Sequence, residues 1–341
     1  MFPFSSYPTG KRGISTKIGI RSVKYIVKEG LYSMKNMRIP LLIALGVAVI
    51  GIILGSFLDL QISSAIASPK NYFGLAISAF APTVAFATVA AMGGGFIAFI
   101  VKGKYHIGLK ILFGFLAAAC LGVAIKYPAG EWFGVNGFYE MGVPEWAGYL
   151  VVIIPECAAM VGGYFLFKDW QNENLWIVFC IIIAVLCIVL LGVVTGLKGI
   201  MHRPRYRFIS SVDVNLFHNW WEPCKNYKEL IEQFHTSSDN FKSYPSGHTA
   251  ETAILLVMFT FLPLAHEKFK KWQMPLFYAS CGFLLLLMLS RILAAAHFLS
   301  DVSFGALSMI VFLYIANEVV MRIKPLQLKE ETPEEEKEKA E

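Results

Sequence analysis

Eight apolar runs, each about as long as a bilayer is thick, constrain the fold of this chain more than any other feature of its sequence. A helix crosses the hydrocarbon core with about 20 apolar residues, because lipid offers no hydrogen-bond partner to unpaired backbone groups. The runs cover residues 39–58, 81–101, 108–126, 147–167, 175–197, 249–265, 274–291 and 301–320. The sequence therefore predicts an all-α, polytopic transmembrane helical bundle with about eight spans, six or seven being the alternatives.

The composition agrees with a membrane protein and excludes several other classes. Of the 341 residues, 56% are hydrophobic and 16% are charged, whereas soluble domains carry about 25% charged residues. Too few polar side chains remain to cover two soluble domains, and disordered, collagen-like and disulfide-scaffold proteins have other compositions. In a soluble protein the net charge of +6 would suggest a nucleic-acid partner. Here the basic residues orient the chain in the bilayer. The predicted partners are therefore membrane lipids, and no nucleic-acid partner is predicted.

The positions of the 30 Lys and Arg residues predict the orientation of the chain, because such residues concentrate in cytoplasmic loops. If the N-terminus is cytoplasmic, most of them fall in cytoplasmic segments. The predicted organisation is a basic cytoplasmic segment (1–38), five transmembrane helices (39–197), an extracytoplasmic loop (198–248), three transmembrane helices (249–321) and an acidic cytoplasmic tail (322–341). We expect a multi-pass protein of the plasma membrane with both termini in the cytoplasm. The sequence predicts no oligomeric state.

Three polar clusters interrupt this apolar pattern, and the predicted topology places all three at the outer face. The first is Lys198-Gly-Ile-Met-His202-Arg203-Pro-Arg205, directly after the fifth span. The second is Pro245-Ser246-Gly247-His248, and the third is Ser290-Arg291-x5-His297-x2-Ser300-Asp301. Long loops are uncommon unless they carry function. The clusters therefore predict one extracytoplasmic site.

The residue types suit phosphate binding. A phosphoryl group in transfer spreads negative charge over its oxygens, so its site needs fixed cations and backbone donors. Lys198, Arg205 and Arg291 supply the cations, and arginine adds a planar fork that matches phosphate oxygens. Ser246 and Gly247 precede an apolar helix, whose N-terminus attracts anions.

Two histidines offer the reactive atoms. His297 and Asp301 are four residues apart, so on a helix they share a face and the carboxylate can orient the imidazole. The other ring nitrogen is then free as a nucleophile. His248 can protonate the leaving oxygen. This chemistry requires no metal and no cofactor, and we expect none.

These motifs resemble those of the type 2 phosphatidic acid phosphatase (PAP2) superfamily, in its membrane lipid phosphatase branch. The second and third motifs match in full and in order. The first departs, because the family has Arg-Pro at its end, whereas Arg205 is followed by Tyr206 and the Arg-Pro pair occurs at Arg203-Pro204. The spacing from Lys198 favours Arg205 as the phosphate ligand, with Arg203 as the alternative, and the neighbouring His202 is a candidate substrate contact.

The resemblance covers about residues 198–320 and implies a six-helix catalytic core, so that two of the five preceding helices are an addition. It also implies residue roles: His297 attacks phosphorus to give a phosphohistidine, Asp301 orients His297, and His248 acts as the general acid. The phosphate is then bound by Lys198, Arg205, Ser246, Gly247 and Arg291.

We therefore expect a metal-independent phosphatase that hydrolyses a lipid phosphate monoester or pyrophosphate at the outer face. Phosphatidic acid, phosphatidylglycerophosphate and undecaprenyl pyrophosphate are candidate substrates. The alternatives are a phosphoryl or headgroup transferase of the same superfamily and a membrane transporter. Glu156, an acid in the middle of the fourth span, fits either a structural or a functional role, because intramembrane acids are costly and often functional.

Overall fold

The computed structural model describes residues 34–133, 144–170 and 174–323. Within these residues eight helices are long and apolar enough to cross a membrane, which confirms the predicted number of spans. They cover Met34–Ile66, Tyr72–Lys102, Ile107–Gly130, Trp146–Phe167, Leu175–Ile209, Gly247–Leu264, Lys270–Leu293 and Leu299–Arg322. The same residues contain no strand, as predicted for an all-α protein. Most of the predicted basic segment (1–38) and of the predicted acidic tail (322–341) lies outside the described residues, which leave out 1–33 and 324–341.

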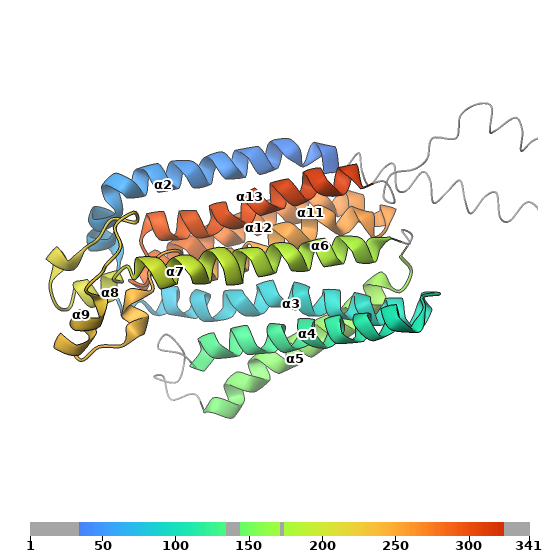
Figure 1. Ribbon diagram of the computed structural model, residues 1–341, viewed down its shortest axis with the longest axis horizontal. Helices are drawn as coiled ribbons and strands as arrows, with labels where there is room; N and C mark the ends of the chain where they lie inside the picture. The colour runs from blue at the N-terminus through green and yellow to red at the C-terminus, as the bar shows by residue number, and fades with distance from the viewer. Residues whose placement is uncertain (1–33, 134–143, 171–173, 324–341) are drawn as a thin grey trace, which may run out of the picture.

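The helices run side by side as an elongated bundle (Figure 1). Six of the eight spans are each formed by one long helix: α2 (Arg38–Ile66), α3 (Tyr72–Lys102), α4 (Ile107–Phe133), α5 (Glu145–Phe167), α12 (Lys270–Leu293) and α13 (Leu299–Arg322). The fifth span joins α6 (Leu175–Cys187), the π-helical η2 (Ile188–Val194) and α7 (Thr195–Met201), and the sixth joins α10 (Gly247–Thr252) and α11 (Ile254–Phe261). Short helices lie at the ends of these spans or in the connections between them: α8 (Tyr206–Ile209), η3 (Val214–Leu216), α9 (Tyr227–Gln233), η4 (Ser238–Phe241), η5 (Leu262–Leu264) and η6 (Glu267–Phe269).

Two helices are longer than the apolar runs that predict them. α3 begins at Tyr72, well before residue 81, because the side chain of Asn71 caps its start by accepting a hydrogen bond from the Gly74 amide at 2.8 Å. α4 continues past Lys126 to Phe133. The third span is therefore of ordinary length, with 24 residues from Ile107 to Gly130.

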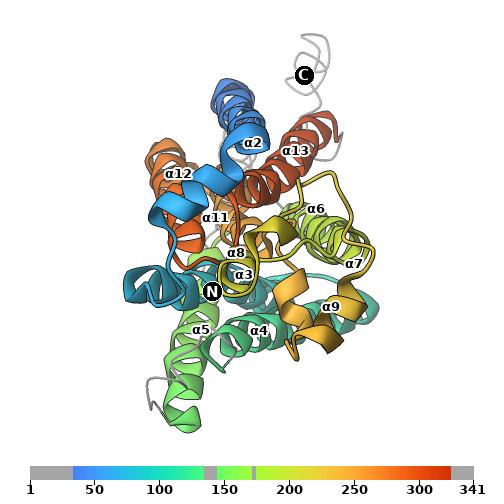
Figure 2. The same cartoon turned by 90° about the vertical axis from the view of Figure 1, so that its left-hand side faces the viewer.

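α3 lies in the middle of the bundle and divides it into two parts (Figures 1 and 2). α4 and α5 pack mainly on α3 and on each other, on the side away from α2 and α13. α2 packs along α13, and α12 packs on α3. α4 and α5 therefore form a peripheral pair that is attached to the other spans mainly through α3.

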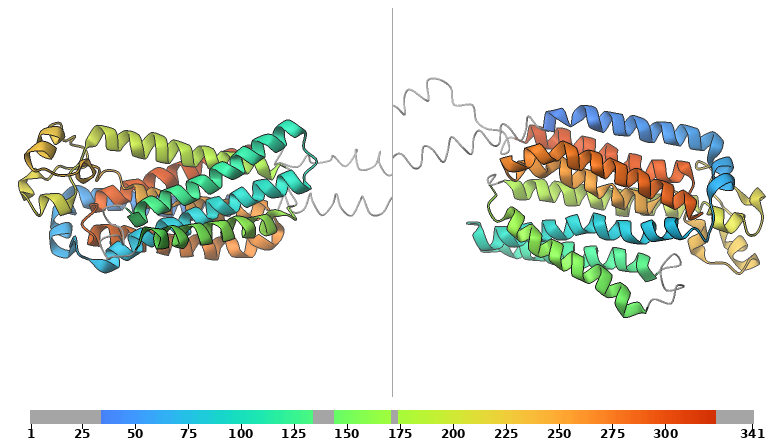
Figure 3. Two further views of the ribbon diagram at one scale, coloured as in Figure 1. Left: turned by 90° about the horizontal axis from the view of Figure 1, so that it is seen from below. Right: turned by 180° about the vertical axis from the view of Figure 1, so that it is seen from behind.

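The two ends of the bundle differ in character. At one end, where α2 begins and α13 ends, the Arg38 guanidinium binds the Glu318 carboxylate through two hydrogen bonds of 2.6 and 2.7 Å. At the other end, α8 and α9 form a cap with a small hydrophobic core of its own, in which Phe208 and Phe241 are buried. Figure 3 shows this cap on the same end from two further sides. All three polar clusters lie at the capped end.

Candidate active site

The three polar clusters meet where α7 ends and α10 and α13 begin, the end that faces the viewer in Figure 2. A Cβ on Gly247 would lie 3.3 Å from the Lys198 ammonium and 3.6 Å from Oε1 of Glu251, so the first and second clusters are in contact. The backbone amide of Ser246 donates a hydrogen bond to the carbonyl oxygen of Asp301 at 3.0 Å, which joins the second cluster to the third. Residues about 100 positions apart in the chain thus share one site.

The imidazole of His297 is buried and held in one orientation. Its side chain is 1% exposed, and Nδ1 lies 2.6 Å from the carbonyl oxygen of Ser243. Because a carbonyl oxygen only accepts hydrogen bonds, Nδ1 carries the proton. The lone pair of Nε2 is then available for nucleophilic attack.

Burial and the surrounding charges disfavour protonation of this imidazole. Burial lowers the pKa of His297 well below its ordinary value of 6.5, and nearby positive charges lower it further. These charges belong, in decreasing order of effect, to Arg291, Arg205, Lys198 and His248. The same residues that the sequence predicts as phosphate ligands and general acid therefore surround the predicted nucleophile.

Asp301 is connected to His297 indirectly, through Ser243. α13 begins at Leu299, so His297 precedes the helix and the two residues do not share a helix face. Oδ2 of Asp301 lies 3.9 Å from Nδ1 of His297. The same oxygen accepts hydrogen bonds from the Ser243 hydroxyl at 2.5 Å and from the Phe298 amide at 2.9 Å. Asp301 thus binds the residues on either side of the imidazole, Ser243 and Phe298, and the Ser243 carbonyl provides the direct contact with His297.

Arg203 is fully buried, and each of its three side-chain nitrogens donates to protein oxygens. Nη2 binds Asp59 of α2 at 2.9 Å, Nη1 binds Asp301 at 2.6 Å and the Ser300 hydroxyl at 2.9 Å, and Nε binds the carbonyl of His218 at 2.8 Å. Its guanidinium is therefore occupied by two carboxylates, which is the environment of a structural arginine.

Arg205 has the environment that a phosphate ligand requires. Its side chain is 6% exposed, and Nη2 binds Asp239 at 3.1 Å. Among the described residues, Nε and Nη1 have no hydrogen-bond partner. Burial alone would raise the pKa of Asp239, but the charges of Arg205 and Arg207 lower it overall. Of the two candidates for the first motif, the geometry thus favours Arg205 over Arg203.

Arg291 is fully buried at the end of α12 and contributes its backbone as well as its charge. Its carbonyl oxygen accepts hydrogen bonds from the amides of Ala296 at 3.1 Å and His297 at 3.3 Å. The turn between α12 and α13 is therefore built on Arg291, and this turn carries the predicted nucleophile.

His202 lies at the edge of the site. It follows α7 in a left-handed backbone conformation with φ of 43°, and its ring stacks on Tyr227 with centroids 3.6 Å apart. This stacking ties the end of α7 to α9 in the cap.

Three residues of the site were not predicted from the sequence. Asp59 directly follows the apolar run at residues 39–58. An acidic residue at the end of a span was the signal that could have identified it. Ser243 precedes the second motif without a pattern that marks it. Gly305 allows α13 to approach α10, because a Cβ there would overlap the carbonyl oxygen of Ser246.

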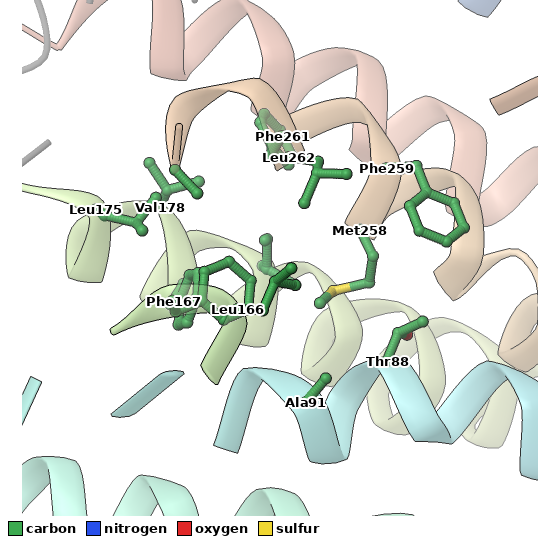
Figure 4. A pocket seen from close by; sticks show the side chains of 13 residues that line it. Thr88, Ala91, Leu166, Phe167, Leu175, Val178, Met258, Phe259, Phe261 and Leu262 are labelled. Carbon is green, nitrogen blue, oxygen red and sulfur yellow. The ribbon is translucent and has the colours of Figure 1, made fainter. Parts of the chain in front are cut away.

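Apolar pockets lie elsewhere in the bundle. One of about 80 Å³ is formed by α3, α5, α6 and α11, with Leu166, Val178 and Met258 among its lining side chains (Figure 4). Its lining contains none of the predicted site residues. In the part of the chain that the structure describes, no group of three His, Cys, Asp or Glu side chains is arranged to hold a metal ion.

Comparison with protein families agrees with the motifs. The family model described as PAP2 superfamily matches residues 173–325, from the start of α6 to the end of α13. No curated protein and no solved structure matches the chain. The match contains all three polar clusters, whereas Asp59 lies outside it. Residues 173–325, and with them the candidate active site, belong to the PAP2 superfamily, whose members are of the phosphatase and phosphoryl-transfer type.

Proposed function

We propose that this protein is an integral membrane phosphatase that hydrolyses a lipid phosphate monoester or pyrophosphate through a phosphohistidine intermediate. The observation that carries the proposal is the 2.6 Å contact of His297 Nδ1 with the Ser243 carbonyl. This contact leaves the Nε2 lone pair of a neutral imidazole free, and the imidazole is surrounded by the cations that lower the pKa of His297. A nucleophile surrounded by fixed positive charge is what transfer of a phosphoryl group requires.

In the first step, the Nε2 lone pair of His297 forms a bond to phosphorus while the bond from phosphorus to the leaving oxygen breaks. His248 donates its proton to that oxygen. Lys198, Arg205 and Arg291, together with Ser246 and Gly247, bind the phosphoryl oxygens and stabilise the negative charge that spreads over them.

In the second step, water attacks phosphorus and the bond to Nε2 breaks. His248, now neutral, accepts the proton of the attacking water, so the enzyme returns to its starting state and inorganic phosphate is released. Throughout, Nδ1 keeps its proton because Ser243 offers only an acceptor. The imidazole is positively charged in the intermediate, and the Asp301 carboxylate at 3.9 Å from Nδ1 stabilises that charge.

Two features support a lipid as substrate. The site lies at the end of the apolar spans, at the depth where the headgroup of an amphiphile lies. An apolar groove of about 190 Å³ runs between α2, α12 and α13. Its lining includes Met288, one helical turn before Arg291, and Ala306, next to Gly305. A lipid whose phosphate occupies the site can place an acyl chain in this groove.

The charge distribution supports an extracytoplasmic site. The ends of the spans opposite to the cap carry many basic residues: Lys102, Lys104, Lys110, Lys168, Lys268, Lys270, Lys271 and Arg322. By the positive-inside rule this end is cytoplasmic. The capped end, with the site, then faces outward.

The test is phosphate release by the purified protein from a panel of phosphatidic acid, phosphatidylglycerophosphate and undecaprenyl pyrophosphate. His297→Ala is expected to abolish release from every member and to retain the thermal unfolding of the wild-type protein. Trapping of a phosphorylated enzyme that is lost in His297→Ala checks the intermediate. Unchanged turnover by His297→Ala would refute the mechanism, and transfer of the phosphoryl group to another lipid would identify a transferase.

A further inference from the structure

We propose that Asp59, on a helix outside the residues that match the PAP2 superfamily, is a positioning residue for the reaction of His297. The proposal rests on the proposed phosphatase function and adds to it the first transmembrane helix of the chain. Asp59 is 3% exposed and lies at the capped end of α2. It reaches the nucleophile through two routes, one geometric and one electrostatic.

The geometric route is the start of α13. Oδ1 of Asp59 accepts a hydrogen bond from the Ser300 amide at 2.9 Å, and Oδ2 accepts one from the Ser300 hydroxyl. Ser300 is the second residue of α13, and a carboxylate is stabilising beside the unpaired amides of a helix N-terminus. Because His297 lies two residues before this helix, the contact of α2 with the start of α13 constrains where the imidazole lies.

A glycine on α2 shows how close this contact is. A Cβ on Gly55, one turn before Asp59, would lie 2.6 Å from the Ser300 amide nitrogen and 2.8 Å from Oδ1 of Asp59. Any side chain at residue 55 would therefore displace α2 from the start of α13. The backbone of α2 approaches the start of α13 closely enough for a short aspartate side chain to reach it.

The electrostatic route passes through Arg203. Asp59 and Asp301 bind opposite nitrogens of the same buried guanidinium, at 2.9 and 2.6 Å. One positive charge between two negative charges leaves the cluster with a net charge of −1. Without Asp59, Arg203 would neutralise Asp301 completely, and the imidazole would lose the negative charge that stabilises it as a phosphohistidine. Such charges act strongly in a buried site because little solvent screens them.

The first experiment compares Asp59→Asn with Glu318→Gln. Each change removes one carboxylate that ties α2 to α13. Glu318 binds Arg38 at the end of the bundle opposite to the site. We expect Asp59→Asn to lower kcat for phosphate release about 10-fold or more, as loss of an outer positioning partner does in other sites, with little change in KM. Glu318→Gln is expected to keep the wild-type kcat.

A second variant separates charge from fold. The double variant Asp59→Asn with Arg203→Gln restores the net charge of −1, because Asp301 is again uncompensated. We expect its kcat to exceed that of Asp59→Asn, and Asp59→Glu, which keeps the charge, to exceed it too. Thermal unfolding of each detergent-purified variant is measured in parallel. If Asp59 served only to hold the fold, the double variant would be at least as impaired as Asp59→Asn.

A third measurement needs no turnover. Vanadate mimics the phosphoryl group bound to a histidine, and its affinity can be measured by titration calorimetry. We expect Asp59→Asn to weaken vanadate binding about as much as it lowers kcat, and Glu318→Gln to leave it unchanged. Wild-type kcat and vanadate affinity in a folded Asp59→Asn protein would overturn this proposal alone. A wild-type protein that neither binds vanadate nor releases phosphate would overturn the proposed function, and this proposal with it.

Discussion

The carbonyl oxygen of Ser243 lies 2.6 Å from Nδ1 of His297, nearer than the 3.9 Å that separates this nitrogen from Oδ2 of Asp301. The Ser243 hydroxyl in turn donates to Asp301 at 2.5 Å. Ser243, which precedes the second motif, therefore connects the carboxylate to the imidazole: its backbone carbonyl contacts His297 and its side-chain hydroxyl contacts Asp301.

Ser243→Ala tests this connection. The backbone carbonyl remains, so the tautomer of His297 is kept, but the link to Asp301 is lost. We expect kcat to fall about 10-fold with little change in KM, measured by steady-state phosphate release. Ser211→Ala, which removes a hydroxyl that donates to the nearby Phe208 carbonyl, serves as the control and keeps wild-type kcat. Equal activity of the two variants would contradict the link.

The pH dependence of activity follows from the lowered pKa of His297. The nucleophile is the neutral imidazole, which is present above its pKa in the folded enzyme and lost as the pH falls through that value. Because this pKa lies well below 6.5, protonation of His297 should not reduce activity between pH 7 and 6.5. The measurement is the profile of kcat/KM against pH, corrected for ionisation of the substrate phosphate. A loss of activity at or above pH 6.5 that His297 protonation explains would contradict the buried, cation-flanked environment.

Asp239 is expected to compete with phosphate for the arginines. Its carboxylate binds Arg205 at 3.1 Å and Arg207 at 2.7 Å. Asp239→Asn removes this negative charge, so we expect inorganic phosphate to inhibit the variant at a several-fold lower concentration than the wild-type protein. Asp213→Asn, an exposed position in the same loop, is the matched control. Weaker inhibition in Asp239→Asn would instead show that the carboxylate orients Arg205 for binding.

Glu156 is expected to be dispensable for catalysis. It is fully buried on α5, a helix that packs mainly on α3 and α4, and among the described residues neither of its carboxylate oxygens has a hydrogen-bond partner. A buried polar group without a partner costs about 1–3 kcal/mol. We therefore expect Glu156→Leu to raise the thermal unfolding temperature and to retain kcat. A large loss of phosphate release in a stable Glu156→Leu protein would favour the functional reading of this residue.

Two adjacent glycines of α5 provide a matched test of helix packing. A Cβ on Gly163 would overlap the carbonyl oxygen of Ala91 in α3, whereas a Cβ on Gly162 meets no atom within 4 Å. We expect Gly163→Ala to destabilise the protein by about 1–3 kcal/mol or more through overpacking, and Gly162→Ala to be neutral or to stabilise by up to about 1 kcal/mol. Thermal unfolding of the two variants in detergent measures the difference. Similar unfolding temperatures would show that α3 and α5 do not touch at Gly163.

The sequence by itself determined the number of spans and identified the residues of the candidate site. A membrane-spanning helix is a local property, because it depends on a continuous run of apolar residues. The motifs around Lys198, His248 and His297 are local too, since each is read within a few positions. Their meeting at one end of the bundle followed from the alternation of the spans across the membrane, and the structure agrees.

Only the tertiary structure decided how these residues are supported. Arg203 and Arg205 are two positions apart and chemically identical, yet Arg203 lies between Asp59 and Asp301 whereas the charge of Arg205 lowers the pKa of His297. Apolar periodicity encodes which residues are buried but not which partner a buried charge will meet. Asp59 and Ser300 are 241 positions apart in the chain, and their pairing depends on the close approach of α2 to α13. That approach is a property of packed helices, which no local pattern in either segment specifies.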